Sequence, residues 1–295
     1  MKVRKILVAV DFSELTEKLL LTAKILKEKY EDAEIILFHS IEKLPTDYNY
    51  WIFIETLEEA IRDLKKQLKE KIDSMASQYL DSYKIVIGEG NPASEIREVA
   101  RRRRVSLVIV GNNGRTGIEE AILGSTSEKI ARKCNIPTLI IKPNEPVNFS
   151  KILIPVDFSV HSLQALKKSF ELLQPFSPKF YVMHAFEEPT FLYEGVVEIG
   201  TLEFFHRLEE LEKEAEGRIE KIVEDYRKKG FDVEAIFEKG KPWEKILDVA
   251  HKYQVDLIAM SSHGSSETFS ILMGSTAHKV LTKCKCNVLI FKPSR

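Results

Sequence analysis

The stretch KILVAVDFSE, Lys5–Glu14, returns later in the chain as KILIPVDFSV, Lys151–Val160. Each copy opens with a run of mostly branched apolar residues, which is typical of a strand buried on both faces of a parallel sheet. An aspartate follows each run directly, and a pattern of helical periodicity comes next. The sequence therefore predicts the same strand, turn and helix at two places in the chain.

The repeat extends over nearly the whole chain. GNNGRTGIEEAILGST at 111–126 aligns with SSHGSSETFSILMGST at 261–276. A period of about 150 residues is the length of a whole domain and far exceeds that of a solenoid repeat. The turn-rich PNEPVN at 143–148 is the seam, so we expect two tandem domains, 1–145 and 146–295.

Five short apolar runs alternate with helical patterns in each copy. In the first copy the expected strands are Ile6–Val10, Glu34–His39, Lys84–Ile87, Leu107–Val110 and Thr138–Ile141. The expected helices are Glu14–Lys29, Glu55–Gln78, Pro92–Arg103 and Ser125–Cys134. The alternation predicts an α/β fold with a doubly wound, five-stranded parallel sheet in each domain and ligands at the carboxyl ends of the strands. Strand order 3-2-1-4-5 would place the first strand beside the fourth.

The composition narrows the class of protein. The 295 residues include 44 basic and 45 acidic side chains, and this balance argues against a nucleic-acid or membrane partner held by a basic surface. No apolar run approaches the ~18–20 residues that span a bilayer, and the N-terminus does not resemble a signal peptide. Three cysteines are too few for a disulfide framework or a zinc site, so we expect a cytoplasmic protein.

The glycine-rich stretch after the fourth strand has the composition of an anion site. Gly111 follows the strand directly, and Gly114 suits a tight turn or the close approach of a ligand. Gly124-Ser125-Thr126 then begins the last helix, where free N–H groups, two hydroxyls and the helix dipole favour a phosphate. One of the two hydroxyl residues is also expected to cap that helix, and Arg115 either adds positive charge or lies exposed.

An aspartate, and not an established phosphate-binding motif, follows the first strand. Neither a P-loop nor G-x-G-x-x-G is present there, and Asp11 and Asp157 take that place. A carboxylate at this point can accept hydrogen bonds from ribose hydroxyls. Asp11 or Ser13 can instead cap the first helix, and both alternatives stay open.

The pattern G-x2-G-x9-G-[ST] after a strand, with an early V-D-F-S, resembles the universal stress protein family in both copies. The resemblance implies an adenine nucleotide α-hydrolase-like fold, Rossmann-like in its three α/β/α layers, that binds ATP or AMP, with Mg²⁺ compatible with ATP. It places Asp11 at the ribose, and Ser40 and Ile41 at the adenine. The residues that it places along the ribose and phosphates are Gly111, Asn113, Gly114, Gly124, Ser125 and Thr126.

The second copy departs from this pattern at two positions. Ser261 replaces the first glycine, and Ser265 replaces Arg115, which removes a potential partner for phosphate. We therefore expect the first copy to be the better site. The candidate residues of a second site are Asp157, Ala185, Ser261, His263, Gly264, Gly274, Ser275 and Thr276.

The last strands, within PTLIIKP and NVLIFKP, each lie at a sheet edge that must be covered or paired. In the family, fifth strands pair antiparallel between domains, so the resemblance implies a pseudo-dimer of the two copies within one chain. Association of two chains into a homodimer stays open, and the sequence identifies no protein partner.

Three functions remain to be distinguished. The first is a nucleotide-binding regulator or sensor of a stress response, without a fast reaction. The second is an ATP-hydrolysing enzyme of the same superfamily, although no second carboxylate is evident in the sequence beside Asp11. The third is an interaction platform that binds no nucleotide. We expect the first, with at most weak ATPase activity, and we expect His39 and His184 to be structural.

Overall fold

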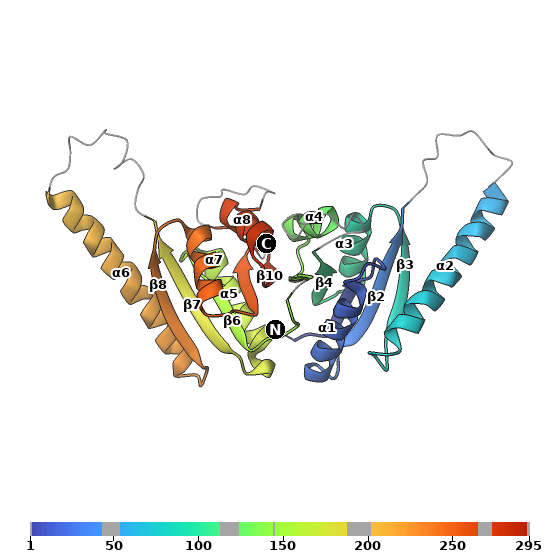
Figure 1. Cartoon of the computed structure of the whole chain (residues 1–295), viewed down its shortest axis with the longest axis horizontal. Helices are drawn as coiled ribbons and strands as arrows, with labels where there is room; N and C mark the ends of the chain where they lie inside the picture. Colours follow the sequence, from blue (N-terminus) through green and yellow to red (C-terminus); the bar gives the residue numbers. More distant parts are fainter. Residues whose placement is uncertain are drawn as a thin grey trace. The chain divides into compact units, whose positions relative to one another are not determined.

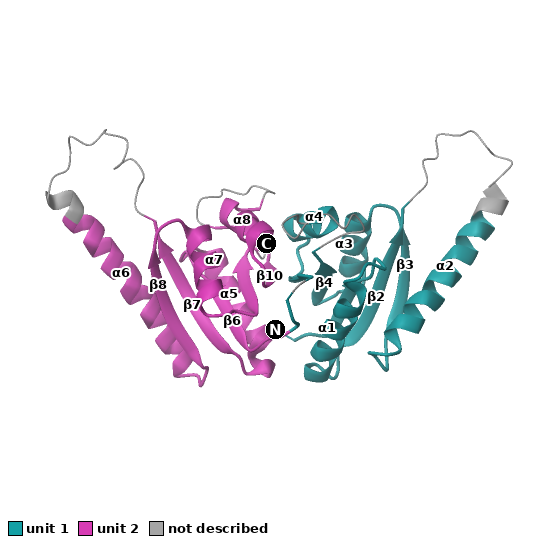
Figure 2. Ribbon diagram, in the orientation of Figure 1, with its two compact units in different colours: residues 1–147 teal, residues 148–295 magenta. Residues whose placement is uncertain are grey.

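The computed structural model describes residues 2–42, 54–112, 124–143, 145–187, 202–264 and 273–293. The chain divides into two compact units, Met1–Val147 and Asn148–Arg295 (Figure 2). Each unit alternates strands and helices along the chain (Figure 1). Among the helices that the structure describes, none is both long and apolar enough to cross a membrane.

The first unit contains a parallel sheet in the predicted order, β3-β2-β1-β4-β5. Its strands are β1 Lys5–Ala9, β2 Glu34–Ile41, β3 Lys84–Glu89, β4 Leu107–Gly111 and β5 Thr138–Ile141. Its helices are α1 Thr16–Lys29, α2 Ile54–Ala76, α3 Pro92–Arg102 and α4 Ser125–Lys133. The predicted α/β fold and strand order are therefore confirmed.

The second unit repeats this arrangement, in the order β10-β9-β6-β7-β8. Its strands are β6 Lys151–Pro155, β7 Lys179–Phe186, β8 Val233–Lys239, β9 Leu257–Ser261 and β10 Asn287–Phe291. Its helices are α5 Val160–Leu173, α6 Leu202–Arg227, α7 Pro242–Lys252 and α8 Ser275–Lys283, with a 3-10 turn, η2, at Gln174–Phe176. The duplication that the sequence predicts is thus a duplication of the fold.

Adjacent strands β1 and β4 form the middle of the first unit's core. Ile6, Leu7 and Val8 of β1 are fully buried, as are Val108 and Ile109 of β4. Right-handed crossovers place α1 and α2 on one face of the sheet and α3 and α4 on the other, and α3 contacts α4. The direction of winding reverses between β1 and β4, and doubly wound sheets bind ligands at such a switch point.

The predicted cap of the first helix is wrong. Helix α1 begins after Leu15, which makes no side-chain cap hydrogen bond, so neither Asp11 nor Ser13 is its cap. The chain turns tightly around Asp11, and α1 begins at Thr16, three residues after Ser13. In the second unit the counterpart of Ser13, Ser159, does cap α5, because its hydroxyl accepts a hydrogen bond from the N–H of Ser162.

Candidate functional site

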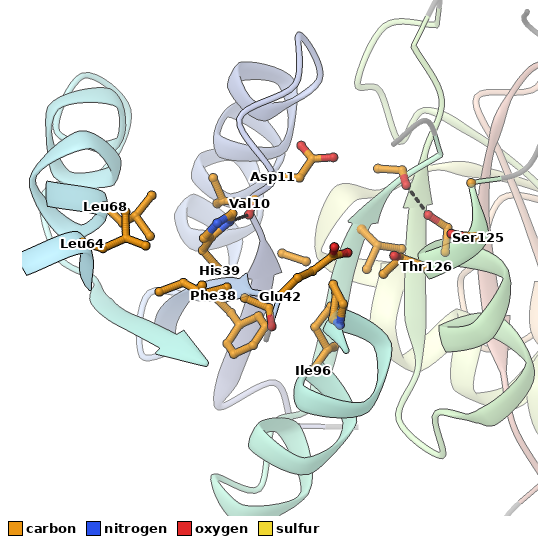
Figure 3. Close-up of a pocket in the computed structure, with 18 residues that line it drawn as sticks. Val10, Asp11, Phe38, His39, Glu42, Leu64, Leu68, Ile96, Ser125 and Thr126 are labelled. Atoms are coloured by element: carbon orange, nitrogen blue, oxygen red, sulfur yellow. Dashed lines mark hydrogen bonds between the residues drawn. The ribbon is translucent and has the colours of Figure 1, made fainter. Parts of the chain in front are cut away.

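A pocket opens at the carboxyl edge of the first unit's sheet, at the switch point between β1 and β4. Its volume is about 570 Å³, which is in the usual range for small-molecule sites. Its walls come from the ends of β1, β2 and β4 and from helices α2, α3 and α4 (Figure 3). The pocket thus lies where the strand order predicts a ligand.

The predicted residues of the first site meet at this pocket. Those that the structure describes all line it: Asp11, Ser40, Ile41, Gly111, Gly124, Ser125 and Thr126. Asn113, Gly114 and Arg115 lie outside the described residues. Positions far apart in the sequence come together because the carboxyl ends of parallel strands share one edge of the sheet.

Asp11 is held in a tight turn directly after β1. Its Oδ1 accepts hydrogen bonds from the N–H of Ser13 at 3.0 Å and from the hydroxyl of Ser13 at 2.6 Å. Phe12, between them, has a φ of 61°, a left-handed conformation that costs a bulky residue about 1–2 kcal/mol. The turn thus holds the carboxylate through Oδ1, and this half-buried side chain lines the pocket.

Helix α4 directs its N-terminus at the same pocket. Its N-cap is Gly124, which has no side chain. The prediction that Ser125 or Thr126 caps this helix is therefore wrong. Both residues instead lie in the first turn and line the pocket. The N–H groups of that turn and the positive end of the helix dipole favour an anion on this side of the pocket.

Gly111 supports the two helices beside the pocket. A Cβ at this position would lie 3.2 Å from Cδ1 of Leu15, so the absence of a side chain lets the start of α1 approach β4 closely. The carbonyl of Gly111 accepts a hydrogen bond from the hydroxyl of Ser127 in α4. This glycine therefore has a packing role in addition to the one expected of it at the ligand.

Sequence reasoning missed the apolar walls of the pocket. Phe38 lines it from β2, Leu64 and Leu68 from α2, and Ile96 from α3 (Figure 3). The periodicity of α2 identifies its apolar positions, but which of them reach past the strand ends depends on where the helix lies over the sheet. Glu42 adds a second carboxylate to the lining, which the sequence did not indicate.

The second unit has a smaller pocket, about 360 Å³, at the equivalent edge. The predicted residues of the second site all line it: Asp157, Ala185, Ser261, His263, Gly264, Gly274, Ser275 and Thr276. Met260 and Ser261 stand where the first unit has Val110 and Gly111. Both replacements add side-chain volume to the pocket wall at the end of the fourth strand, which is consistent with the smaller pocket.

The loop after β9 packs against the aspartate that follows the second unit's first strand. A Cβ at Gly264 would lie 2.7 Å from Oδ2 of Asp157, so a side chain at this position would displace the carboxylate. The neighbouring His263 places Nδ1 2.7 Å from the hydroxyl oxygen of Ser262. The end of the fourth strand and the end of the first therefore meet in this unit as the strand order predicts.

His39 and His184 each hydrogen-bond to the carbonyl of the residue before the aspartate, as structural histidines do, and His39 also lines the first pocket. Nδ1 of His39 lies 2.7 Å from the carbonyl oxygen of Val10, and Nδ1 of His184 lies 2.8 Å from that of Val156. Since a carbonyl only accepts, each Nδ1 carries the proton. Burial lowers the pKa of His184, which favours the neutral ring.

Comparisons with known proteins agree with this fold and its duplication. The universal stress protein family model matches residues 2–142 and again residues 148–292. A universal stress protein of Methanocaldococcus jannaschii is 30% identical over 164 residues, which make up 55% of this chain and 93% of that protein. One from Thermus aquaticus is 29% identical over 145 residues, 49% of this chain and 99% of that protein.

A solved structure shows the same fold over the full length. The crystal structure of a universal stress protein from Archaeoglobus fulgidus matches with a TM-score of 0.68 and 21% identity, and the match covers 100% of both chains. The two matches of the family model fall one in each compact unit. The chain therefore belongs to the universal stress protein family, as a member with two family domains in tandem.

Proposed function

We propose that the first unit binds an adenine nucleotide, ATP or AMP, and that the protein acts in the cytoplasm as a regulator or sensor of a stress response. One observation carries the proposal: a single pocket joins the carboxylate of Asp11 to the N-terminus of α4. A carboxylate suits the hydroxyls of a ribose, and a helix N-terminus suits phosphates. A nucleotide presents both groups at a fixed spacing.

The order of strands supports one direction for the ligand. The strands β2, β1 and β4 lie next to one another in that order. The pocket residues therefore lie in the same order along the edge of the sheet: Ile41 at the end of β2, Asp11 after β1, and then the start of α4. The apolar walls from α2 and α3 enclose the β2 end, where Leu64 and Ile96 line the pocket. We infer that the base lies at β2, the ribose at β1 and the phosphates at α4.

The second unit supports a weaker site of the same kind. Its pocket keeps Asp157 and the Gly274-Ser275-Thr276 helix start, but it is smaller by about 210 Å³, the difference between 570 and 360 Å³. Ser261 adds a side chain to the pocket wall at the end of the fourth strand. Ala185 lacks the hydroxyl of Ser40, which donates to the carbonyl of Gly90 in the first unit. We propose that this unit binds the nucleotide less tightly than the first.

Slow hydrolysis of ATP is a second candidate activity, and Glu42 is the observation that favours it, as a second carboxylate in the first pocket. Mg²⁺ would be held mainly by the phosphates of the nucleotide, whose oxygens are the ligands that this ion prefers. Among the described residues, no group of three or more His, Cys, Asp or Glu could hold a metal ion. Steady-state turnover faster than about 1 s⁻¹, a low value for an enzyme, would favour catalysis over sensing.

Retention of nucleotide tests the proposal. The purified chain is incubated with ATP, passed through gel filtration at micromolar concentration, and the retained nucleotide is identified by mass spectrometry. We expect an adenine nucleotide, and we expect its loss in the variant Ser125→Val/Thr126→Val, which alters the first turn of α4. Retention of no adenine nucleotide by the wild-type chain would contradict the proposal and favour the interaction platform.

The assembly of the protein is a separate question. Pairing of the two fifth strands with each other and association of two chains into a homodimer both stay predictions. Analytical ultracentrifugation with and without ATP measures the second directly. A change of mass on adding nucleotide would connect occupancy of the pocket to an output.

A further inference from the structure

The residue after the site aspartate has the same unusual backbone in both units. Phe12 and Phe158 each have a φ of 61°. This is the left-handed region that favours glycine and is rare for bulky side chains. Strain of this kind persists only where the surroundings fix it, and it concentrates at functional sites. The contacts of the two rings show what fixes it here.

In the first unit the ring of Phe12 contacts an imidazole and a cation. Its centroid lies 4.7 Å from that of His39, at the end of β2, and Nζ of Lys71, in α2, lies 4.4 Å from the centroid of Phe12. The imidazole is itself fixed by its hydrogen bond to the carbonyl of Val10, the residue before the site aspartate (dashed in Figure 3). This Phe–His–cation cluster ties the turn after β1 to the next strand and helix.

The second unit builds the same cluster with one different residue. The centroid of Phe158 lies 4.3 Å from that of His184, and Cζ of Arg218, in α6, lies 4.5 Å from the ring centroid of Phe158. His184 bonds to the carbonyl of Val156. Arginine replaces the lysine of the first unit, so the property shared by the two units is a positive charge over the aromatic ring.

We propose that Phe12 and Phe158 are positioning residues that aim the aspartate before them at the ribose of a nucleotide, an inference that rests on the proposed function. In both turns Oδ1 of the aspartate accepts a hydrogen bond of 3.0 Å from the N–H two residues later. The conformation of the intervening phenylalanine therefore sets where the second oxygen of Asp11 or Asp157 points. Neither phenylalanine is among the described residues that line the pockets, so each acts through its aspartate.

The alternative is that the rings only fill space, and ribose selectivity distinguishes the two roles. The test compares the affinity of the full chain for ATP and for 2′,3′-dideoxy-ATP by calorimetry. We expect the wild type to prefer ATP by about tenfold, the value of a hydrogen bond to a charged group. Asp11→Ala/Asp157→Ala should abolish this preference. Phe12→Gly/Phe158→Gly should abolish it too, because the turn loses the ring contacts that fix its conformation, while the affinity for dideoxy-ATP stays unchanged.

The glycine variant removes the rings and accepts the left-handed φ without strain, so it isolates the side chain. Phe12→Tyr/Phe158→Tyr should retain the wild-type preference. If the glycine variant fails to fold, Lys71→Met/Arg218→Met removes only two exposed cations and should lower the preference. Equal loss of affinity for both nucleotides, or a preference that survives every variant, overturns this inference alone. Absence of any nucleotide binding by the wild type overturns the proposed function as well.

Discussion

The two units place the same elements around pockets of unequal size. The first encloses about 570 Å³ and the second about 360 Å³, although strand order and the aspartate after the first strand are the same. The clearest differences lie in the last two residues of the fourth strand, where Met260 and Ser261 replace Val110 and Gly111. The comparison shows that the backbone plan fixes the place of the site, while a few side chains decide how much room it has.

Ion pairs give a second difference between the units. Glu34 pairs with Lys84 across β2 and β3 at 3.0 Å, whereas Lys179 pairs with Glu234 across β7 and β8 at 2.9 Å. These are equivalent positions of the two copies with the charges exchanged. The hydrogen bond from Lys84 lowers the pKa of Glu34, and the hydrogen bond to Glu234 raises the pKa of Lys179.

The long helix after the second strand repeats this exchange. Lys65 in α2 pairs with Glu89 in β3, while Glu212 in α6 pairs with Lys239 in β8 at 2.6 Å. If β2 of the first copy paired with β8 of the second, Glu34 would meet Glu234. If α2 of the first copy packed on β8, Lys65 would meet Lys239. Such pairs are destabilising, so the exchanged charges favour pairing within each copy over exchange between copies.

The largest effect that separates the two units is expected in their cores. Phe170 of α5 stacks on Tyr226 at 3.8 Å between ring centroids and also contacts Phe180 at 4.1 Å, whereas the aligned residue of α1 is Lys24. Phe170→Ala should therefore cost the second unit about 3–5 kcal/mol. Urea unfolding followed by Trp243 fluorescence in a Trp51→Phe background measures this loss.

The matched control for that measurement follows the unfolding of the first unit. The chain has two tryptophans, one in each unit, so Trp243→Phe leaves a single reporter in the first. Its transition should shift much less when Phe170→Ala is introduced. Equal shifts at the two reporters would contradict separate cores.

A smaller effect is expected from giving the first unit the serine of the second. Gly111→Ser places a Cβ 3.2 Å from Leu15, and overpacking of this kind costs about 1–3 kcal/mol. Ser261 is tolerated in the second unit, where His161 and Ala165 stand in place of Leu15 and Leu19, the two residues that a Cβ at Gly111 would meet. Thermal unfolding of the variant should show the loss, and the reverse change, Ser261→Gly, should not stabilise the second unit. An unchanged transition in Gly111→Ser would show that α1 can retreat without cost.

Reversal of one charge tests the exchanged ion pairs. Glu34→Lys brings a third positive charge beside Lys5 and Lys84 and should cost at most about 1 kcal/mol, because the side chains involved are partly exposed. Glu34→Lys/Lys84→Glu recreates the arrangement of the second unit and should recover most of that loss. A double variant less stable than the single one would contradict a pairwise interaction.

The smallest expected effect is a loss of stability of the second unit at acidic pH. Because burial lowers the folded-state pKa of His184 below its usual value near 6.5, the unfolded chain binds its proton first as the pH falls. The stability that this neutral histidine contributes is present above about pH 6.5 and is lost as the pH falls from there toward the folded-state pKa. Urea unfolding of the second unit between about pH 5 and pH 7.5 should show this slope, and His184→Gln should reduce it. Parallel pH profiles of variant and wild type would contradict the prediction.

Features of the fold and the site that depend on local sequence patterns could be predicted, whereas features that depend on contacts between distant residues could not. The strands were predictable because short apolar runs such as Ile6–Val10 reflect burial on both faces. Asp11 and Ser125 could be placed in one site because the parallel strand order brings them to one edge. The left-handed φ of Phe12 could not be predicted, since local sterics oppose it and only distant contacts fix it. The apolar wall at Leu64 likewise depends on the position of a whole helix.

We propose that the first pocket holds an adenine nucleotide more tightly than the second. Calorimetric titration of the full chain with ATP, repeated for Ser125→Val/Thr126→Val and for Ser275→Val/Thr276→Val, distinguishes the two pockets. We expect the tighter binding event to disappear with the first pair of substitutions and to survive the second. Loss of the tighter event with Ser275→Val/Thr276→Val, or no binding of ATP to the wild-type chain, would show that this order of affinities is wrong.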